Sequence, residues 1–182
     1  MNEQSRKRVC LLTGGPGTGK TTIIRQAVGG WHGRAGGFYT EELRDRGQRQ
    51  GFRLVTLAGQ SGVLAHVDIR SPCRVGKYGV DVAALDAIGV ASLEEATSRS
   101  DLIVIDEIGK MELFSSRFRD AVFAAIDSDK RVLGTVMSAP HPWADKVKTR
   151  PEVWLVEVTR ANRDRVLSEV IRWLELNATG DQ

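Results

Sequence analysis

The sequence has few of the features by which proteins bind metals through sulfur or cross membranes. It contains only two cysteines, Cys10 and Cys73, and no Cys-x-x-Cys pair, so it predicts no zinc site. No apolar run approaches the length of a membrane span, and no apolar segment of the signal-peptide kind follows the basic start. We therefore expect a protein of the reducing cytoplasm that contacts no membrane.

An excess of one charge is also lacking. The 182 residues include 26 Lys and Arg against 23 Asp and Glu, which gives a formal net charge of +3. The basic residues alternate with acidic ones, as in residues 163–165, so no basic stripe forms and a nucleic-acid partner is not expected. The length suggests a single domain over residues 1–182, with a disordered tail at about 177–182. We also expect a monomer.

Glycine, by contrast, is concentrated in residues 14–21, which read Gly-Gly-Pro-Gly-Thr-Gly-Lys-Thr, the spacing of a phosphate-binding loop called Walker A. Glycine tolerates positive φ, which allows successive N–H groups to point into one nest that holds phosphate. Lys20 would reach the β- and γ-phosphates, and the Thr21 hydroxyl would bind Mg²⁺. The expected nucleotide-binding residues here are Gly14, Gly15, Pro16, Gly17, Thr18, Gly19, Lys20, Thr21 and Thr22. Of these, Thr22 is expected to face the helix interior.

The flanks of this motif predict a strand before it and a helix after it. Residues 9–12 form a short apolar run with a β-branched start, which is typical of a buried strand. Ile23, Ile24 and Ala27 follow at helical spacing, and a glycine pair at 29–30 ends the pattern. The alternative is a glycine-rich linker that contains the motif by accident, and these flanks disfavour it.

A second apolar run, residues 102–105, leads directly into Asp106 and Glu107. This pattern indicates a Walker B strand, and a strand next to the loop-bearing strand would bring Asp106 close to a Mg²⁺ ion. Glu107 could then deprotonate an attacking water. An acidic surface turn is the alternative. The candidate catalytic residues are therefore Lys20 and Glu107, and the candidate metal ligands are Thr21 and Asp106.

Several polar residues near the expected carboxyl edge of the sheet could each have one of two roles. Lys110 could contact phosphate or remain solvated, and Ser138 could contact the γ-phosphate, although capping of a loop is favoured. Asn162 follows the last strand, where nucleobase contacts often lie, but an N-cap of the final helix is favoured. The roles of Arg74 and Lys77 are left open.

The remaining pattern predicts a mainly parallel α/β sheet with an antiparallel addition at one edge. Strands are expected at 37–40, 52–57 and 63–66, with a polar turn at 44–50 and a loop over 71–80. Asp81 should cap one helix, and Ser92-Leu93-Glu94-Glu95 has the form of a capping box that opens a second helix. Further strands are expected at 131–137 and 154–158, and further helices over 113–126, 143–149 and 166–174.

Four strings together resemble one known family: Gly-Phe-Tyr-Thr-Glu-Glu at 37–42, Arg-Val-Gly-Lys-Tyr at 74–78, Asp-Glu-Ile-Gly-Lys-Met-Glu-Leu at 106–113, and Thr159-x-x-Asn162-Arg163. The family is the small P-loop nucleoside-triphosphatases of thermophilic prokaryotes, with the human cancer-related nucleoside-triphosphatase as a relative. The resemblance runs from about residue 8 to about residue 171. It implies a P-loop NTPase fold, a three-layer α/β sandwich with helices on both faces and a strand inserted between the two Walker strands.

The resemblance also implies an activity, Mg²⁺-dependent hydrolysis of nucleoside triphosphates (ATP, GTP, CTP and UTP) to diphosphate and phosphate. It places a second nucleotide-binding segment at Leu102, Ile103, Val104, Ile105, Asp106, Glu107, Ile108 and Gly109.

Two other functions stay open. One is a small-molecule or nucleotide kinase of the same fold. The other is a nucleotide switch without catalysis. A kinase needs an arginine-rich lid, and its candidates at 44, 46, 49 and 53 fall on a hairpin, whereas Glu107 suits water activation. Hydrolysis is therefore favoured.

Overall fold

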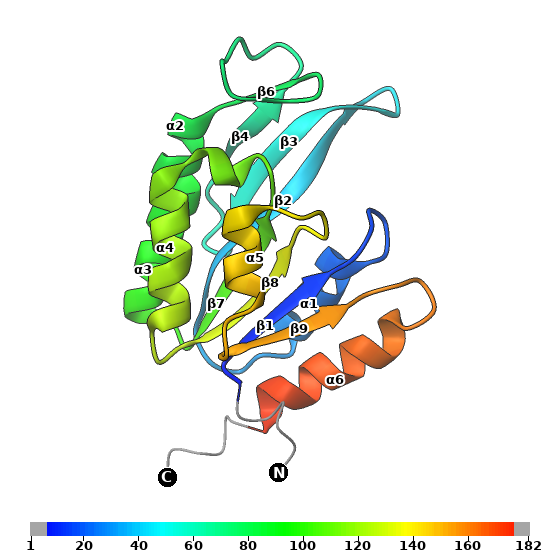
Figure 1. Cartoon of the computed structure of the whole chain (residues 1–182), viewed down its shortest axis with the longest axis vertical. Helices are drawn as coiled ribbons and strands as arrows, with labels where there is room; N and C mark the ends of the chain where they lie inside the picture. The colour runs from blue at the N-terminus through cyan, green and yellow to red at the C-terminus, as the bar shows by residue number, and fades with distance from the viewer. Residues whose placement is uncertain (1–6, 177–182) are drawn as a thin grey trace.

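The computed structural model describes residues 7–176, so the tail expected at 177–182 lies outside the described residues. A sheet of nine strands runs through the described chain in the order β5-β6-β4-β3-β2-β7-β8-β1-β9 (Figure 1). The strands are β1 Val9–Thr13, β2 Ala35–Asp45, β3 Gln48–Thr56, β4 Ser61–His66, β5 Arg74–Val75, β6 Tyr78–Val80, β7 Leu102–Ile108, β8 Arg131–Val136 and β9 Val153–Glu157.

Helices cover both faces of this sheet, so the predicted three-layer α/β architecture is confirmed. The helices are α1 Lys20–Gly29, α2 Val82–Ala84, α3 Ala91–Arg99, α4 Ser116–Asp127, α5 Pro142–Lys148 and α6 Arg163–Glu175. A π-helical stretch, η2 Leu85–Val90, joins α2 to α3, and a 3-10 turn, η3 Glu112–Phe114, precedes α4.

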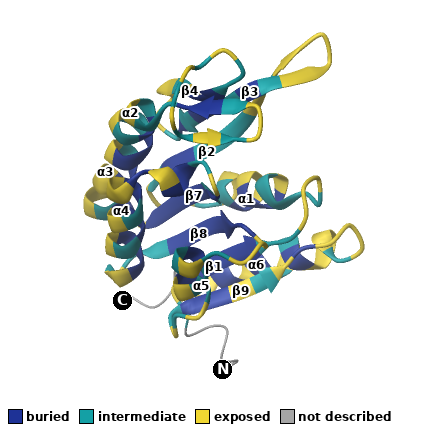
Figure 2. Cartoon of the chain, turned by 45° about the horizontal axis from the view of Figure 1, so that its top comes forward, coloured by how far each residue is buried: buried dark blue, intermediate teal, exposed yellow. Residues whose placement is uncertain are grey.

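Two apolar cores lie on the two faces of the sheet. Phe118 of α4 and Leu93 of α3 belong to one core, and Ile24 of α1 and Val170 of α6 belong to the other. The short apolar runs of β1 and β7 are fully buried between these cores, as expected for strands covered on both faces (Figure 2). No helix within residues 7–176 is long and apolar enough to cross a membrane.

The parallel half of the sheet consists of β2, β7, β8, β1 and β9, which all pair in parallel. Their carboxyl ends therefore meet at one edge. The expectation that β7 lies next to β1 is wrong, because β8 pairs with both and separates them. The resemblance implied such an inserted strand, and that implication is confirmed.

The antiparallel addition begins in β2 itself. Tyr39 still pairs with Asp106 of β7, but beyond it β2 continues as one arm of a long hairpin with β3. The expected wide turn at 44–50 is wrong, since the strands extend to Asp45 and Gln48 and leave only Arg46 and Gly47 between them. Both turn residues have positive φ, which matches a two-residue hairpin turn whose twist fits the strands.

The segment 71–80 is also more regular than a loop, because it contains the small hairpin of β5 and β6. The hairpin of β2 and β3 was predicted apart from its turn, but the polar residues and glycines of 71–80 concealed the small hairpin of β5 and β6. The tip of the longer hairpin is exposed (Figure 2).

Two predicted helix starts are wrong. Asp81 does accept a hydrogen bond from the Ala84 N–H, as expected, but the helical path then continues through η2 into α3. Ser92 donates to the Gly89 carbonyl instead of capping a new helix. The helix expected from 113 begins at Ser116, after Ser115 accepts a hydrogen bond from the Phe118 N–H.

We expect Gly37→Ala to unfold the chain much more easily than Gly47→Ala. Both glycines have positive φ, so each substitution strains the backbone by about 1–2 kcal/mol. A Cβ at Gly37 would also lie 2.0 Å from the Val104 carbonyl oxygen, whereas one at Gly47 meets nothing within 4 Å. Denaturant unfolding should show a loss above about 3 kcal/mol for Gly37→Ala only. Equal losses would contradict the tight β2–β7 contact.

Candidate active site

The glycine-rich segment forms a tight loop between β1 and α1, as predicted. Gly14, Gly17 and Gly19 all have positive φ. At Gly14 the close approach is also steric, because a Cβ would lie 2.3 Å from the Val158 carbonyl oxygen. The side chain of Lys20 folds across the loop, where its Nζ donates to the carbonyls of Gly14 at 2.8 Å and Gly15 at 3.0 Å.

The first turn of α1 opens toward the same space. Its N-cap is Gly19, and no side chain of the described residues caps the helix. The free N–H groups of a helix start attract anions. Together with Lys20, the loop therefore provides the donors of an anion site.

Asp106 and Glu107 lie within β7, near its carboxyl end, rather than after it. Asp106 is 2% exposed, and its Oδ1 accepts a hydrogen bond of 2.8 Å from the Thr135 hydroxyl on β8. Its Oδ2 is buried with no hydrogen-bond partner among residues 7–176. Burial raises the pKa of Asp106, while the nearby hydroxyls of Thr21 and Thr135 and the charge of Lys20 oppose that rise.

This donor set fits Mg²⁺. A hard cation prefers oxygen ligands, and Asp106 Oδ2, which has no hydrogen-bond partner among residues 7–176, could serve as one beside the Thr21 hydroxyl. Charge on a buried carboxylate is costly without a partner, so a cation would relieve the site as well as be held by it.

Glu107 and Glu112 form a carboxyl pair on either side of Gly109. A Cβ at Gly109 would lie 3.2 Å from Glu107 Oε1 and 3.0 Å from Glu112 Oε2, and Glu112 Oε2 accepts the Gly109 N–H at 3.1 Å. Burial and the charge of Glu107 raise the pKa of Glu112 to about 8. Burial and Asp106 also raise the pKa of Glu107, but Lys20 lowers it.

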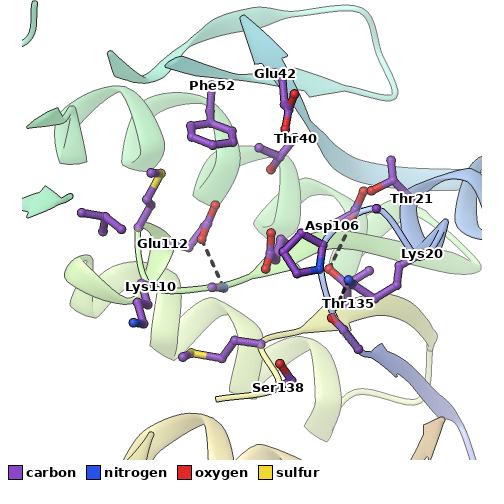
Figure 3. Close-up of a pocket in the computed structure, with 18 of the residues that line it drawn as sticks. Lys20, Thr21, Thr40, Glu42, Phe52, Asp106, Lys110, Glu112, Thr135 and Ser138 are labelled. Carbon is purple, nitrogen blue, oxygen red and sulfur yellow. Dashed lines mark hydrogen bonds between the residues drawn. The ribbon is translucent and has the colours of Figure 1, made fainter. Parts of the chain in front are cut away.

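A cavity of about 540 Å³ joins these groups (Figure 3). The P-loop lines one end, the end of β7 and the following loop form the floor, and the β2–β3 hairpin forms a wall. The lining residues are Gly14, Pro16, Gly17, Gly19, Lys20, Thr21, Thr22, Thr40, Glu42, Arg49, Phe52, Val75, Asp106, Glu107, Gly109, Lys110, Met111, Glu112, Thr135, Met137, Ser138 and Ala139.

Most sequence-predicted site residues line this cavity, but not all. Gly15 and Thr18 belong to the loop without lining it, and the Thr18 hydroxyl donates to the Gly15 carbonyl. Thr22 lines the cavity and is exposed, so the expectation that it faces the helix interior is wrong. A further group of predicted residues is fully buried in β7 outside the cavity lining, where it supports Asp106 from the core: Leu102, Ile103, Val104, Ile105 and Ile108.

The structure shows which of the polar residues with two interpretations line the cavity and which lie elsewhere. Lys110 and Ser138 line the cavity. Asn162 makes no side-chain cap of α6; its amide accepts from the Thr159 N–H and donates to the Glu157 carbonyl, so it shapes the loop after β9. Arg74 donates to the Lys77 carbonyl within the small hairpin, and neither residue lines the cavity.

Thr135 and the residues of the hairpin wall were not predicted as site residues. Thr135 is a polar residue at the end of an otherwise apolar strand run, which is the same signal that Asp106 gives. Thr40 and Glu42 alternate along β2 with Tyr39 and Glu41, so they share one face, and Phe52 pairs opposite Glu42 on β3. This grouping depends on strand register, which the sequence alone does not reveal.

Three features define a P-loop nucleotide-binding protein here. A glycine loop ends at the start of a helix, a lysine folds over that loop, and a buried aspartate lies on β7, two strands away from the loop-bearing β1. More narrowly, the chain belongs to the NTPase family, whose model matches residues 9–171.

Relatives in this family span nearly the whole chain. It is 47% identical to nucleoside-triphosphatase THEP1 of Thermotoga sp. (strain RQ2), over 92% of this chain and 95% of that protein. It is 37% identical to the human cancer-related nucleoside-triphosphatase, over 90% and 95%. The predicted resemblance is thus confirmed.

Solved structures agree with the fold. The crystal structure of THEP1 from the hyperthermophile Aquifex aeolicus superposes with a TM-score of 0.83 at 37% identity, covering 92% of this chain and 99% of that one. The solution structure of the human cancer-related nucleoside triphosphatase gives a TM-score of 0.77 at 35% identity, covering 96% and 99%. The predicted P-loop fold class is confirmed.

We expect Glu112→Gln to stabilise the protein at pH 8 and to leave it little changed at pH 5. The folded chain holds a proton on Glu112 up to about pH 8, whereas the unfolded chain loses it near the ordinary value of 4.5. The unfolded state therefore binds fewer protons between these values, and stability falls as the pH rises. Glutamine is neutral and can still accept the Gly109 N–H.

The measurement is the free energy of unfolding at both pH values without nucleotide or metal. Glu175→Gln, at an exposed glutamate of α6, is the control and should change neither value. An equal effect of Glu112→Gln at pH 5 and pH 8 would contradict the raised pKa.

Proposed function

We propose that the chain hydrolyses nucleoside triphosphates with Mg²⁺ held by Thr21 and Asp106, and with Glu107 as general base. The observation that carries this proposal is the buried carboxylate of Asp106, whose Oδ2 has no hydrogen-bond partner within the described chain by geometry. The Thr21 hydroxyl lies near this carboxylate, at the start of the helix that follows the phosphate loop. The names of the relatives, which are nucleoside-triphosphatases, support the reaction class.

The phosphates would lie in the loop. Its N–H groups and the start of α1 would hold the α- and β-phosphates, and Lys20 would turn from the Gly14 and Gly15 carbonyls to the β- and γ-phosphates. An ammonium there opposes the charge that gathers on the phosphoryl oxygens during transfer. The bound Mg²⁺ would supply further charge neutralisation at these oxygens.

Glu107 is the better base of the carboxyl pair. Glu112 keeps its proton up to about pH 8, whereas Lys20 favours the ionised form of Glu107. Burial and the charge of Asp106 raise the pKa of Glu107, which makes its carboxylate a stronger base than an ordinary glutamate. Glu107 would accept a proton from water as the water oxygen bonds to the γ-phosphorus and the bond to the bridging oxygen breaks.

The nucleobase would lie on the other side of the loop. There a small pocket of about 180 Å³ is lined by residues of α1 and α6, including Thr22. Its polar side chains Gln26, Arg163 and Asp164 are all exposed, so they are solvated and poorly fixed for reading a base edge. This arrangement supports broad base tolerance.

We expect turnover to require Mg²⁺ or Mn²⁺. Asp106→Asn removes the ligand charge, so it should raise the metal concentration needed for half-maximal activity while nucleotide binding without metal changes little. Titration of both metals, with EDTA as the zero point, measures this. Full turnover in excess EDTA would contradict the metal site.

We expect ATP, GTP, CTP and UTP to be hydrolysed within about tenfold in kcat/KM, because about 1.4 kcal/mol is all the discrimination that exposed side chains should provide. Phosphate release from the four nucleotides on one preparation tests this. A preference above about a hundredfold for one base would show a more rigid base pocket than the one between α1 and α6.

We expect Glu107→Gln to lower single-turnover hydrolysis by about 10²–10⁴-fold, the usual loss of a general base. The Kd for ATP with Mg²⁺ should move little, because the carboxylate would contact the water rather than the nucleotide. Equal losses in binding and chemistry would make Glu107 a metal ligand, and no loss would place the base elsewhere, with Glu112 next to test.

Location in the cytoplasm, a monomeric state and a single domain stay predictions.

A further inference from the structure

The cavity is larger than the proposed hydrolysis requires. The γ-phosphate would end above Lys20 and Asp106, and hydrolysis needs only a water beyond it. Yet the cavity continues from there to the β2–β3 hairpin, over a part that we call the far end, lined by Glu42, Arg49, Phe52, Val75, Lys110 and Met111. Because we place the nucleobase in the small pocket between α1 and α6, the far end would not be needed for the same nucleotide.

One wall of the far end is apolar, and its side chains are packed in place. The ring of Phe52 packs edge-on against Tyr78 at 5.3 Å between centroids, with the planes at 76°. Val75 and Met111 are half-buried on the same cavity (Figure 3 shows the Phe52 ring facing it). A ring, a branched aliphatic group and a thioether together suit a flat, apolar ligand body.

A polar pair stands beside this apolar wall. Glu42 Oε1 accepts from Arg49 Nη1 at 2.7 Å, and the Arg49 guanidinium lies over the Phe52 ring at 5.4 Å. The pair therefore presents both an acceptor and a donor at the edge of the ring. A heteroaromatic base has the complementary pattern, a flat face with donors and acceptors along its rim.

Between the far end and the phosphate end lies Thr40. Its hydroxyl is buried and has no hydrogen-bond partner among residues 7–176, although it lines the cavity. Buried hydroxyls are seldom left unpaired, so this one calls for a polar group from a ligand. Glu112 lies near this junction in Figure 3, and Glu107 lines the same cavity.

We propose that the far end binds a nucleoside as a second substrate, and that its hydroxyl can replace water as acceptor of the γ-phosphoryl group. This inference rests on the proposed nucleotide site. The acceptor oxygen would bond to the γ-phosphorus while the bond from that phosphorus to the β–γ bridging oxygen breaks. The nucleoside diphosphate leaves with the electron pair, and the hydroxyl proton passes to the Glu107 carboxylate. The products are a nucleoside monophosphate and a nucleoside diphosphate.

The experiment follows label from ATP marked on its γ-phosphate, with the full chain, Mg²⁺ and one acceptor at a time. The acceptors are adenosine, guanosine, cytidine and uridine, and glycerol serves as a hydroxyl compound without a ring. Chromatography separates labelled phosphate from labelled nucleoside monophosphate. We expect labelled nucleoside monophosphate and no labelled glycerol phosphate.

Two variants locate the acceptor. Phe52→Ala removes the ring, and Glu42→Gln breaks the polar pair at a surface position without disturbing the apolar packing. Each should lower the ratio of transfer to hydrolysis by at least about tenfold, as for one lost stacking or charged hydrogen-bond contact. Val63→Ala, at an exposed residue of β4 in the same antiparallel addition, is the matched control and should leave that ratio unchanged.

The outcomes separate this proposal from the proposed hydrolysis. Phosphate release without any labelled nucleoside overturns the acceptor site and leaves the hydrolase intact. Transfer that persists in both variants overturns its location, and transfer to glycerol alone overturns the ligand class. Absence of both phosphate release and transfer would instead refute the nucleotide site on which the inference rests.

Discussion

The site depends on keeping one carboxylate, that of Asp106, almost wholly out of water. Burial of a charge without compensation is costly, and Thr135 compensates only one of the two oxygens. The other oxygen has no hydrogen-bond partner among residues 7–176, and under the proposed function a cation would supply the missing interaction. The parallel strands serve this arrangement, since β7 delivers the aspartate and β8 delivers the threonine to the same edge of the sheet.

The antiparallel addition changes what lies above that edge. Through it, β2 brings Thr40 and Glu42 and β3 brings Phe52 to the cavity that Asp106, Glu107 and Glu112 also line. One part of β2 pairs in parallel with β7, where Tyr39 lies opposite Asp106, and the rest of β2 pairs antiparallel with β3. Burial raises the pKa of both Glu107 and Glu112 in this cavity.

The sequence predicted the local parts of the site well and the non-local parts poorly. The loop between β1 and α1 was predictable because its glycine spacing is a constraint of the backbone itself, and Asp106 because a carboxylate ends an apolar run. The partner of Asp106, Thr135, and the wall residue Phe52 were missed, since each reaches the site through pairing between strands distant in the chain. Ser92 misled the prediction because serine bonds to nearby backbone in several geometries, of which a helix cap is only one. Asn162 does lie at the N-cap position of α6, as predicted, but its side chain bonds to the backbone of Glu157 and Thr159 rather than to the helix.

The position of β1 has a consequence for the order in which the protein can take shape during synthesis. β1 is made first among the strands, yet it lies between β8 and β9, the last two. Its loop also needs the backbone at Val158, which packs against Gly14. The phosphate loop therefore cannot reach its final conformation, and its flanking strand stays unpaired on both sides, until most of the chain has left the ribosome. Contacts between residues so far apart in the sequence form slowly. The phosphate-binding motif is therefore synthesised long before the nascent chain can bind a nucleotide.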